Sequence, residues 1–156
     1  MSKKIICSGA IFYTLETKRF LFVRRANTKR DNVWGLVGGT TEDKETPWEG
    51  LQREIKEEIG LIVDENDLVK IGVFKSFQKY DTGIIDNEFH HVFIAELKVG
   101  IDQLICQKEE VEALKLVTTK TYYDLLNDAK TSNHFIASNK KYYEFVLKKI
   151  LEKLNN

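Results

Sequence analysis

The segment that most constrains the fold of this chain is residues 39–61, which read GTTEDKETPWEGLQREIKEEIGL. Its centre carries the start and stop signals of one helix. Thr46 suits the N-cap, Pro47 suits the first helical position, and Glu49 at the third position completes a capping box. Gly60 stands where a left-handed residue would end the helix. The sequence therefore predicts a helix between Thr46 and Gly60.

The side chains of this predicted helix divide into two faces. The apolar side chains are spaced by three and four positions and form one stripe, made of Trp48, Leu51, Ile55 and Ile59. Three acidic side chains follow the same spacing on another face, where their carboxylates should converge: Glu54, Glu57 and Glu58.

Converging carboxylates repel one another by about 0.2–0.5 kcal/mol per exposed pair on a helix. Arg53 and Lys56 offset this repulsion only partly. A bound divalent cation removes it, because hard ions such as Mg²⁺ or Mn²⁺ take several oxygen ligands. The acidic face therefore indicates a metal site, with an ordinary solvated face as the alternative.

The same segment matches a known motif at every defined position. Written as G-x5-E-x7-R-E-U-x-E-E-x-G-U, with U a bulky aliphatic residue, the motif runs from Gly39 to Leu61. The chain thus resembles the Nudix (MutT-like) hydrolase family. The resemblance continues upstream, where FLFVRR and VWGLVGGT are similar to the family's strand, loop and W-G-x-P-G-G lead-in. Val37 replaces the usual proline.

The resemblance implies roles for individual residues. It implies metal ligation by the box glutamates and by the carbonyl oxygen of the glycine before the box, which are Glu54, Glu57, Glu58 and Gly38. Arg53 would pair with box glutamates and orient them, together with Glu45. Their alternative is an ordinary surface ion pair, worth under about 1 kcal/mol.

The rest of the chain predicts strands on both sides of this helix and a second helical layer. Strands are expected within 4–15, 19–25, 33–37, 68–78, 88–99 and 113–118, and a short helix over 119–127. An amphipathic helix is expected over about 139–154, packing on the chain's own sheet or on a second copy. These elements predict one domain over 1–156, an α/β fold in which helices sandwich a mixed β-sheet, and the resemblance implies the same Nudix fold.

The composition of the chain limits the classes of partner that it is expected to bind. Lys+Arg and Asp+Glu both number 24, so no net charge draws the chain to nucleic acid or to membrane. Only Ile5 and Ile6 separate Lys4 from Cys7, too few for a signal segment. Cys7 and Cys106 form no CxxC pair and are expected to be reduced core residues. We expect a cytoplasmic protein with a small-molecule nucleotide as partner, either a monomer or a homodimer.

The resemblance implies a metal-dependent pyrophosphohydrolase that cleaves a nucleoside diphosphate linked to another moiety, such as an NTP or dNTP. The chemistry of pyrophosphate cleavage is consistent with a metal requirement, because cations neutralise the phosphate oxygens and lower the pKa of the attacking water. Catalytic roles are expected for Glu57, Glu54 and Arg53. The general base is either a box glutamate or a glutamate of a later loop, with Glu110 as the preferred candidate and Glu88 as a weaker one.

Substrate contacts are less constrained by the sequence. Arg24, Arg25, Lys29 and Arg30 surround the loop ahead of the box, and Arg25 is the candidate for a phosphate contact. Trp34, Phe77 and Tyr80 are candidates for stacking on a base, although packing is the default for aromatic residues. His90 and His91 alternate on a strand and lack the spacing of a zinc site, so they are expected to be structural.

Three other functions remain open. One is the isomerase branch that shares the Nudix fold, although neither cysteine lies in a recognisable motif for it. A non-catalytic Nudix-fold module would bind a nucleotide, although its box glutamates would be expected to degenerate. An RNA 5′-end pyrophosphohydrolase would need a basic groove along the backbone, against which the zero net charge argues.

Overall fold

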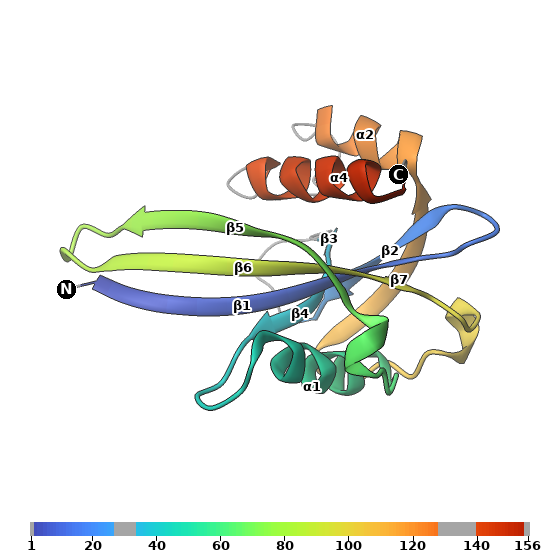
Figure 1. Cartoon of the computed structure of the whole chain (residues 1–156), viewed down its shortest axis with the longest axis horizontal. Helices are drawn as coiled ribbons and strands as arrows, with labels where there is room; N and C mark the ends of the chain where they lie inside the picture. The colour runs from blue at the N-terminus through green and yellow to red at the C-terminus, as the bar shows by residue number, and fades with distance from the viewer. Residues whose placement is uncertain (1, 27–33, 128–139, 155–156) are drawn as a thin grey trace.

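The computed structural model describes residues 2–26, 34–127 and 140–154 (Figure 1). These residues form a seven-stranded mixed sheet. Its strands are β1 (Ser2–Tyr13), β2 (Arg19–Arg25), β3 (Trp34–Gly35), β4 (Val37–Thr40), β5 (Val69–Lys79), β6 (Ile85–Glu96) and β7 (Val111–Thr118). The helices are α1 (Pro47–Ile59), α2 (Thr119–Asn127) and α4 (Lys140–Leu154), with short 3-10 turns at Glu65–Asp67 and Ile101–Gln103.

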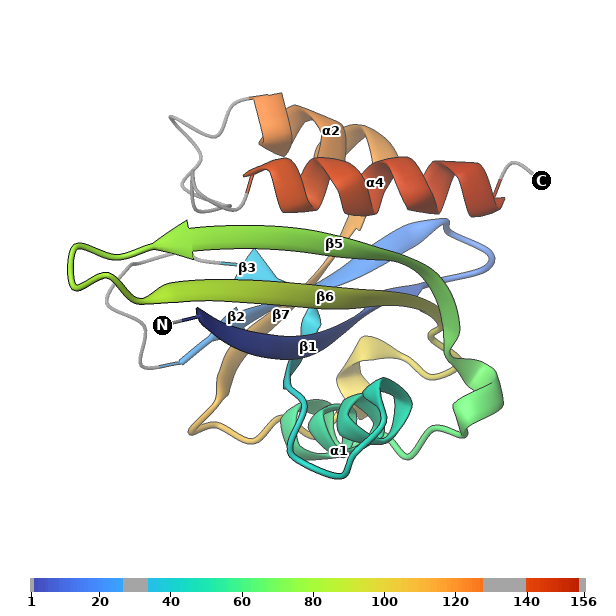
Figure 2. The same ribbon diagram turned by 60° about the vertical axis from the view of Figure 1, so that its left-hand side comes forward.

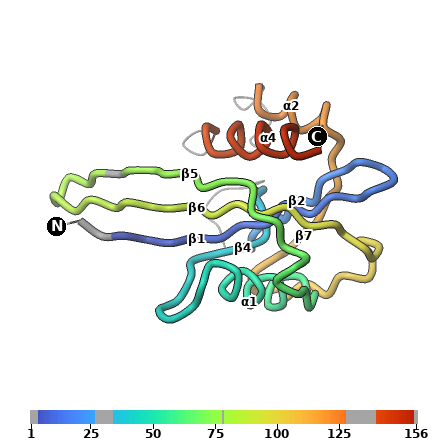
Figure 3. Tube along the Cα trace, in the orientation of Figure 1, coloured from blue at the N-terminus to red at the C-terminus, as the bar shows by residue number. Residues whose placement is uncertain are grey.

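The centre of the sheet is β1, which pairs in parallel with β6 along its whole length. The strands follow the order β3-β2-β1-β6-β5, with β4 also paired to β1 and β7 to β2. Two strands, β2 and β4, share the edge of β1 that faces away from β6. Near its end Tyr13 pairs with Phe20 of β2, whereas Cys7 to Ala10 pair with β4. The tube trace in Figure 3 shows β1, β6 and β5 running side by side.

Two helical layers cover the sheet, as the view in Figure 2 shows, with α1 on one face and α2 and α4 on the other. The α1 face is filled by a buried cluster that includes Leu51, Ile55, Ile59, Phe12 and Phe93. The opposite face holds a second cluster that includes Tyr122, Val146, Ile150, Ile11 and Phe22. Consecutive residues of β1, such as Ile11 and Phe12, thus enter different clusters, as the pleat of a strand requires. The predicted sandwich of a mixed sheet between helices is confirmed.

The predicted elements agree with the observed ones with boundaries differing by a few residues, except that the one strand expected over 33–37 is two strands, β3 and β4, which pair with β2 and β1. In α4 the residues Tyr143, Val146, Leu147 and Ile150 are buried, but Leu151 and Leu154 at its end are 38% and 44% exposed. The expectation that both cysteines are core residues is wrong, because Cys7 and Cys106 are each only partly buried. The predicted loop with Lys29 and Arg30 lies outside the described residues.

Within the described ranges, no helix is both long and apolar enough to cross a membrane.

Candidate active site

Both ends of α1 are capped as the sequence predicts. The Thr46 hydroxyl accepts a hydrogen bond from the Glu49 N–H (3.1 Å), and the Glu49 carboxylate accepts one from the Thr46 N–H (2.9 Å). Gly60 adopts φ = 73°, and its N–H donates to the Lys56 carbonyl. Leu51, Ile55 and Ile59 are fully buried under the sheet. The caps and the apolar stripe together fix which side chains of α1 point away from the core.

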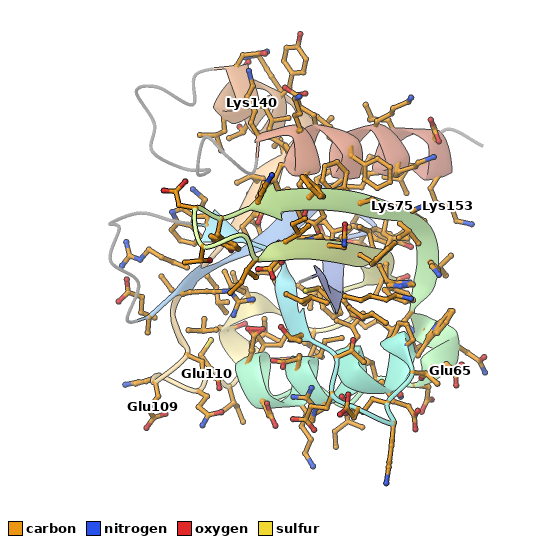
Figure 4. The ribbon with its side chains drawn as sticks, turned by 90° about the vertical axis from the view of Figure 1, so that its left-hand side faces the viewer. Glu65, Lys75, Glu109, Glu110, Lys140 and Lys153 are labelled. Carbon is orange, nitrogen blue, oxygen red and sulfur yellow. The ribbon has the colours of Figure 1, made fainter. Side chains whose placement is uncertain are left out.

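Glu54 and Glu57 of α1 meet Glu110, which comes from the loop before β7. One carboxylate oxygen of each residue lies within 4.8 Å of the others. The loop is tied to the end of α1, since Gln107 N–H donates to the Glu58 carbonyl and Ile105 N–H to the Ile59 carbonyl. Figure 4 shows Glu110 on this loop, beside α1. The fold thus joins two segments distant in sequence into one acidic cluster.

Arg53 holds this cluster from one side. Its Nε and Nη2 donate to the two oxygens of Glu45 at 2.9 and 3.1 Å, while Nη1 donates to Glu54 Oε1 at 2.9 Å. Nη1 also lies 3.5 Å from Glu57 Oε2, and Nη2 donates to the Thr40 carbonyl. The planar guanidinium is suited to such a fork of contacts. It therefore orients two carboxylates of the cluster.

The cluster carries more negative charge than Arg53 balances locally. Burial raises the pKa of the Glu54 carboxyl; Arg53 lowers it, and Glu57 and Glu110 raise it further, with a net upward shift. A carboxyl with a raised pKa among like charges indicates a place where a cation would be stabilised.

Glu58 takes part in a different arrangement. Its side chain is fully buried, and its oxygens accept hydrogen bonds from Arg25 Nη1 (2.6 Å), Arg25 Nη2 (3.3 Å) and the Gly38 N–H (2.9 Å). Arg25 Nη2 also donates to the carbonyls of Gly38 (2.8 Å) and Leu36 (3.2 Å). Arg25 and Glu58 together clamp the backbone at Gly38 in place.

The two glycines after Val37 lie where a side chain would collide. A Cβ on Gly38, whose φ is 152°, would fall 2.0 Å from the Ser8 carbonyl oxygen. A Cβ on Gly39 would fall 2.7 Å from Glu54 Cδ and Oε1. Position 38 therefore requires glycine for β4 to approach β1, whereas a side chain at position 39 would displace the carboxylate of Glu54. Val37 itself is fully buried in the α1-side core.

Two cavities meet at this point. A smaller one, of about 420 Å³, is lined by Glu54, Glu110 and the backbone of β4. A larger cleft, of about 560 Å³, lies between β1, β5, β6 and the start of α4. Arg25, Gly38 and Gly39 line both. The acidic cluster therefore lies next to a cleft large enough for a small organic ligand.

The structure places the predicted site residues in three groups. Glu54, Glu57 and Glu110 form the cluster with Arg53 beside it, while Glu58, Arg25 and Gly38 form the buried clamp. Trp34 and Tyr80 lie outside the lining of the larger cleft. Trp34 packs under the cations of Lys115 and Arg24, and Tyr80 follows β5 and hydrogen-bonds to Asp86.

The larger cleft is lined instead by residues that the sequence did not single out as ligand contacts. They come from three strands and from α4, and include Cys7, Phe74, Ser76, His90 and Tyr142. Phe77 lines it too, and was considered for stacking from the sequence. The alternation of Phe74 and Ser76 along β5 places both on one face and was the only sequence signal available.

The protein is an α/β/α sandwich with an acidic helix beside a cleft. Comparison with known proteins identifies its family. Residues 6–138 match the NUDIX domain. The chain therefore belongs to the Nudix family.

Similar proteins include Nudix hydrolase 7 of Arabidopsis thaliana, 28% identical over 122 residues, and an uncharacterized Nudix hydrolase of Clostridium acetobutylicum, 28% identical over 144 residues. The alignments cover 77% and 87% of this chain, but 41% and 68% of those proteins. Among solved structures, the NUDIX domain of Shewanella oneidensis NrtR complexed with ADP ribose superposes with a TM-score of 0.68 at 15% identity. That superposition covers 99% of this chain and 90% of that one, and it shows a shared fold.

Proposed function

We propose that this chain is a metal-dependent pyrophosphohydrolase that cleaves a nucleoside diphosphate linked to another moiety, by attack of water at phosphorus. The observation that carries this proposal is the convergence of Glu54, Glu57 and Glu110 within 4.8 Å beside a cleft of about 560 Å³. The cluster offers the oxygen ligands that a catalytic cation needs, and the cleft offers room for the organic part of a substrate.

The residues of the cluster fit Mg²⁺ or Mn²⁺, because these ions prefer carboxylate and carbonyl oxygens. We assign Glu54, Glu57 and Glu110 as ligands, with the carbonyl oxygen of Gly38, which lines the same cavity and already accepts a hydrogen bond from Arg25, as a further one. When bound, the cation would neutralise phosphate oxygens and lower the pKa of a water molecule.

The other residues act by holding these ligands in position. Arg53 fixes Glu54 and Glu57 through contacts of 2.9 and 3.5 Å. Glu58 and Arg25 hold Gly38, so we propose that Glu58 serves the site mainly through the clamp. Arg25 also lines both cavities and its side chain is 38% exposed, so we propose that it contacts a substrate phosphate while it remains paired with Glu58.

The attacking water must lose a proton to a group within hydrogen-bond reach. Arg53 already engages Glu54 and Glu57. We therefore propose that Glu110, which reaches the cluster from the loop before β7, accepts this proton through the carboxylate oxygen that does not bind the cation.

The larger cleft supports a nucleoside as the organic part of the substrate. Phe74 and Tyr142 meet edge to face with ring centroids 5.4 Å apart, and Phe77 at the cleft is 65% exposed. Such aromatic surfaces suit a flat nucleobase. We propose these three residues for base stacking in place of Trp34 and Tyr80. The ADP ribose bound by the NrtR domain supports a nucleotide-derived ligand on this fold.

The test is a turnover panel of NTPs, dNTPs, ADP-ribose, NDP-sugars and dinucleoside polyphosphates, each with Mg²⁺, with Mn²⁺ and with a chelator. We expect one class to release a mononucleotide, and the chelator to abolish this release. Glu57→Gln should lower turnover by orders of magnitude, because it removes a ligand from a 45%-exposed position while disturbing little packing.

The matched control is Glu65→Gln. Glu65 is exposed on the 3-10 turn after α1 and lies at the opposite end of this layer from Glu110 (Figure 4). This variant should keep wild-type turnover. No turnover across the panel, with nucleotide still bound, would favour the binding module or an RNA 5′-end substrate. Wild-type turnover by Glu57→Gln would remove the cation site from this helix.

A further inference from the structure

A second group of potential metal ligands lies on the floor of the larger cleft. Strands β1 and β6 pair in parallel, with Cys7 opposite His90 and Ile5 opposite Glu88. Residues two apart on a strand share a face, so Cys7, Glu88 and His90 point to the same side of the sheet. All three line the cleft.

The three side chains are close enough to share one ion. The Cys7 sulfur, a Glu88 carboxylate oxygen and a His90 ring nitrogen all lie within 4.8 Å of one another. His90 Nε2 and Glu88 Oε1 are 3.9 Å apart. Bond lengths of about 2.0–2.3 Å place two ligands of a tetrahedral zinc ion roughly 3.3–3.8 Å apart. Small rotations of these side chains would therefore bring all three to bonding distance.

The chemistry of this group differs from that of the acidic cluster. A thiolate, an imidazole and a carboxylate are the ligands that zinc and similar transition metals prefer, whereas Mg²⁺ selects oxygen ligands alone. Three protein ligands with one side open are also the pattern of zinc sites that keep a position for water or substrate. His90 and Glu88 are 25% and 32% exposed, so an ion can enter from the cleft.

The surroundings support the group. Burial raises the pKa of the Cys7 thiol, and the Glu88 carboxylate adds to this rise, whereas a hydrogen bond from Thr40, opposite Cys7 on β4, offsets part of it. A bound cation would favour the thiolate, because the thiolate and not the thiol is the metal ligand. The Tyr142 ring packs against His90 with centroids 5.0 Å apart, and Phe74 lies at 6.4 Å. These contacts restrict the orientation of the imidazole.

We propose that Cys7, Glu88 and His90 bind Zn²⁺ or a similar transition-metal ion, with the remaining ligand position facing the cleft. The site is separate from the acidic cluster and rests on no part of the proposed hydrolysis. An ion bound there would occupy the floor of the cleft, where any ligand of the cleft would meet it.

Cobalt binding to the Cys106→Ser protein tests the site. The chain has two cysteines, so in this variant any thiolate-to-cobalt charge-transfer absorption reports Cys7 alone. Co²⁺ is added in the presence of excess Mg²⁺, which occupies oxygen-only sites. We expect the absorption band to saturate at one ion per chain and to disappear when Zn²⁺ displaces Co²⁺.

Substitutions then test the ligand set. In the Cys106→Ser background, His90→Gln and Glu88→Gln should each weaken Zn²⁺ binding by more than about tenfold, measured by competition with a chromophoric chelator. Glu57→Gln is the matched control and should keep both the band and the affinity. Thermal unfolding without metal verifies that each variant is folded.

Two results would overturn the proposal. One is the absence of a thiolate-to-cobalt band in the Cys106→Ser protein, which requires no variant of the site itself. The other is a Zn²⁺ affinity that neither His90→Gln nor Glu88→Gln lowers, since Cys7 would then bind the ion without these two residues.

Discussion

Replacing Glu58 with glutamine should destabilise the fold, because Glu58 is the buried partner of Arg25. Its side chain is fully buried and accepts three hydrogen bonds, two from Arg25 and one from the Gly38 N–H. Glutamine keeps the shape but loses the negative charge and replaces one acceptor oxygen with an NH₂ donor. That donor would point at the guanidinium of Arg25.

The expected cost follows from the exposure of the two partners. Removing one member of a fully buried ion pair costs about 3–5 kcal/mol, whereas an exposed pair contributes about 0–1 kcal/mol. The Arg25 side chain is 38% exposed, so water can solvate part of the charge that the variant leaves behind. The amide oxygen can also retain the Gly38 hydrogen bond. We therefore expect a loss of about 2–3 kcal/mol in the free energy of unfolding, between these two limits.

The assay is equilibrium urea denaturation of the wild type, Glu58→Gln and Glu57→Gln under identical conditions without added metal. Glu57 is 45% exposed, and its neighbours Glu54 and Glu110 are also acidic. Its substitution should therefore change stability by less than about 0.5 kcal/mol. The two variants would thus separate the clamp from the cation site. Equal stability of Glu58→Gln and wild type would refute the assignment of Glu58 to a clamp.

Three further predictions concern α1 and its neighbours. Ile55→Ala should lower the free energy of unfolding by roughly 2–5 kcal/mol, because Ile55 is fully buried, and urea denaturation would measure this; a change near zero would mean that the helix faces are misassigned. Gly39→Ala should lower the free energy of Mg²⁺ binding by more than it lowers the free energy of unfolding, because the added Cβ displaces the carboxylate end of Glu54. Calorimetric titration with Mg²⁺ and urea denaturation would measure the two losses. Mg²⁺ affinity should fall with decreasing pH, starting above the ordinary glutamate pKa of about 4.3, because the raised pKa of Glu54 favours the protonated form that cannot bind a cation. Glu110→Gln removes one cause of that rise, so the midpoint of the decrease should move to lower pH; an unchanged midpoint would contradict this reasoning.

Local signals explain why so much of α1 could be predicted. The capping box at Thr46, the glycine at position 60 and the apolar stripe depend on residues within one or two turns of each other, where sequence spacing determines spatial proximity. The closeness of Glu58 to the buried face of α1 could also have been predicted from the residue spacing. At 3.6 residues per turn, Glu58 points about 20° from Leu51, whereas Glu57 points about 100° away from Glu58. Glu58 therefore lies at the edge of the apolar stripe, and grouping it with Glu54 and Glu57 overlooked its nearness to the core.

The larger cleft could not be predicted in the same way. Cys7 meets His90 through the register of two parallel strands far apart in sequence, and a shift of one residue would turn His90 to the other face. Tyr142 reaches the cleft from α4, whose placement depends on packing across the sheet. The spacing of His90 and His91 along the chain carries no information about ligands that neighbouring strands supply, so the proposed zinc site could not be predicted from that spacing.

The shared edge of β1 explains why the acidic cluster and the cleft meet at all. Because β1 contacts β2 only near Tyr13, the rest of that edge is open to β4, which brings Gly38 and Gly39 between the two cavities. A substrate whose nucleoside occupies the cleft must pass its phosphates over this strand to reach Glu54. Side chains at these two positions would collide with Ser8 or with Glu54 itself. The proposed hydrolysis therefore depends on a strand edge without side chains, which the clamp of Arg25 and Glu58 holds in place.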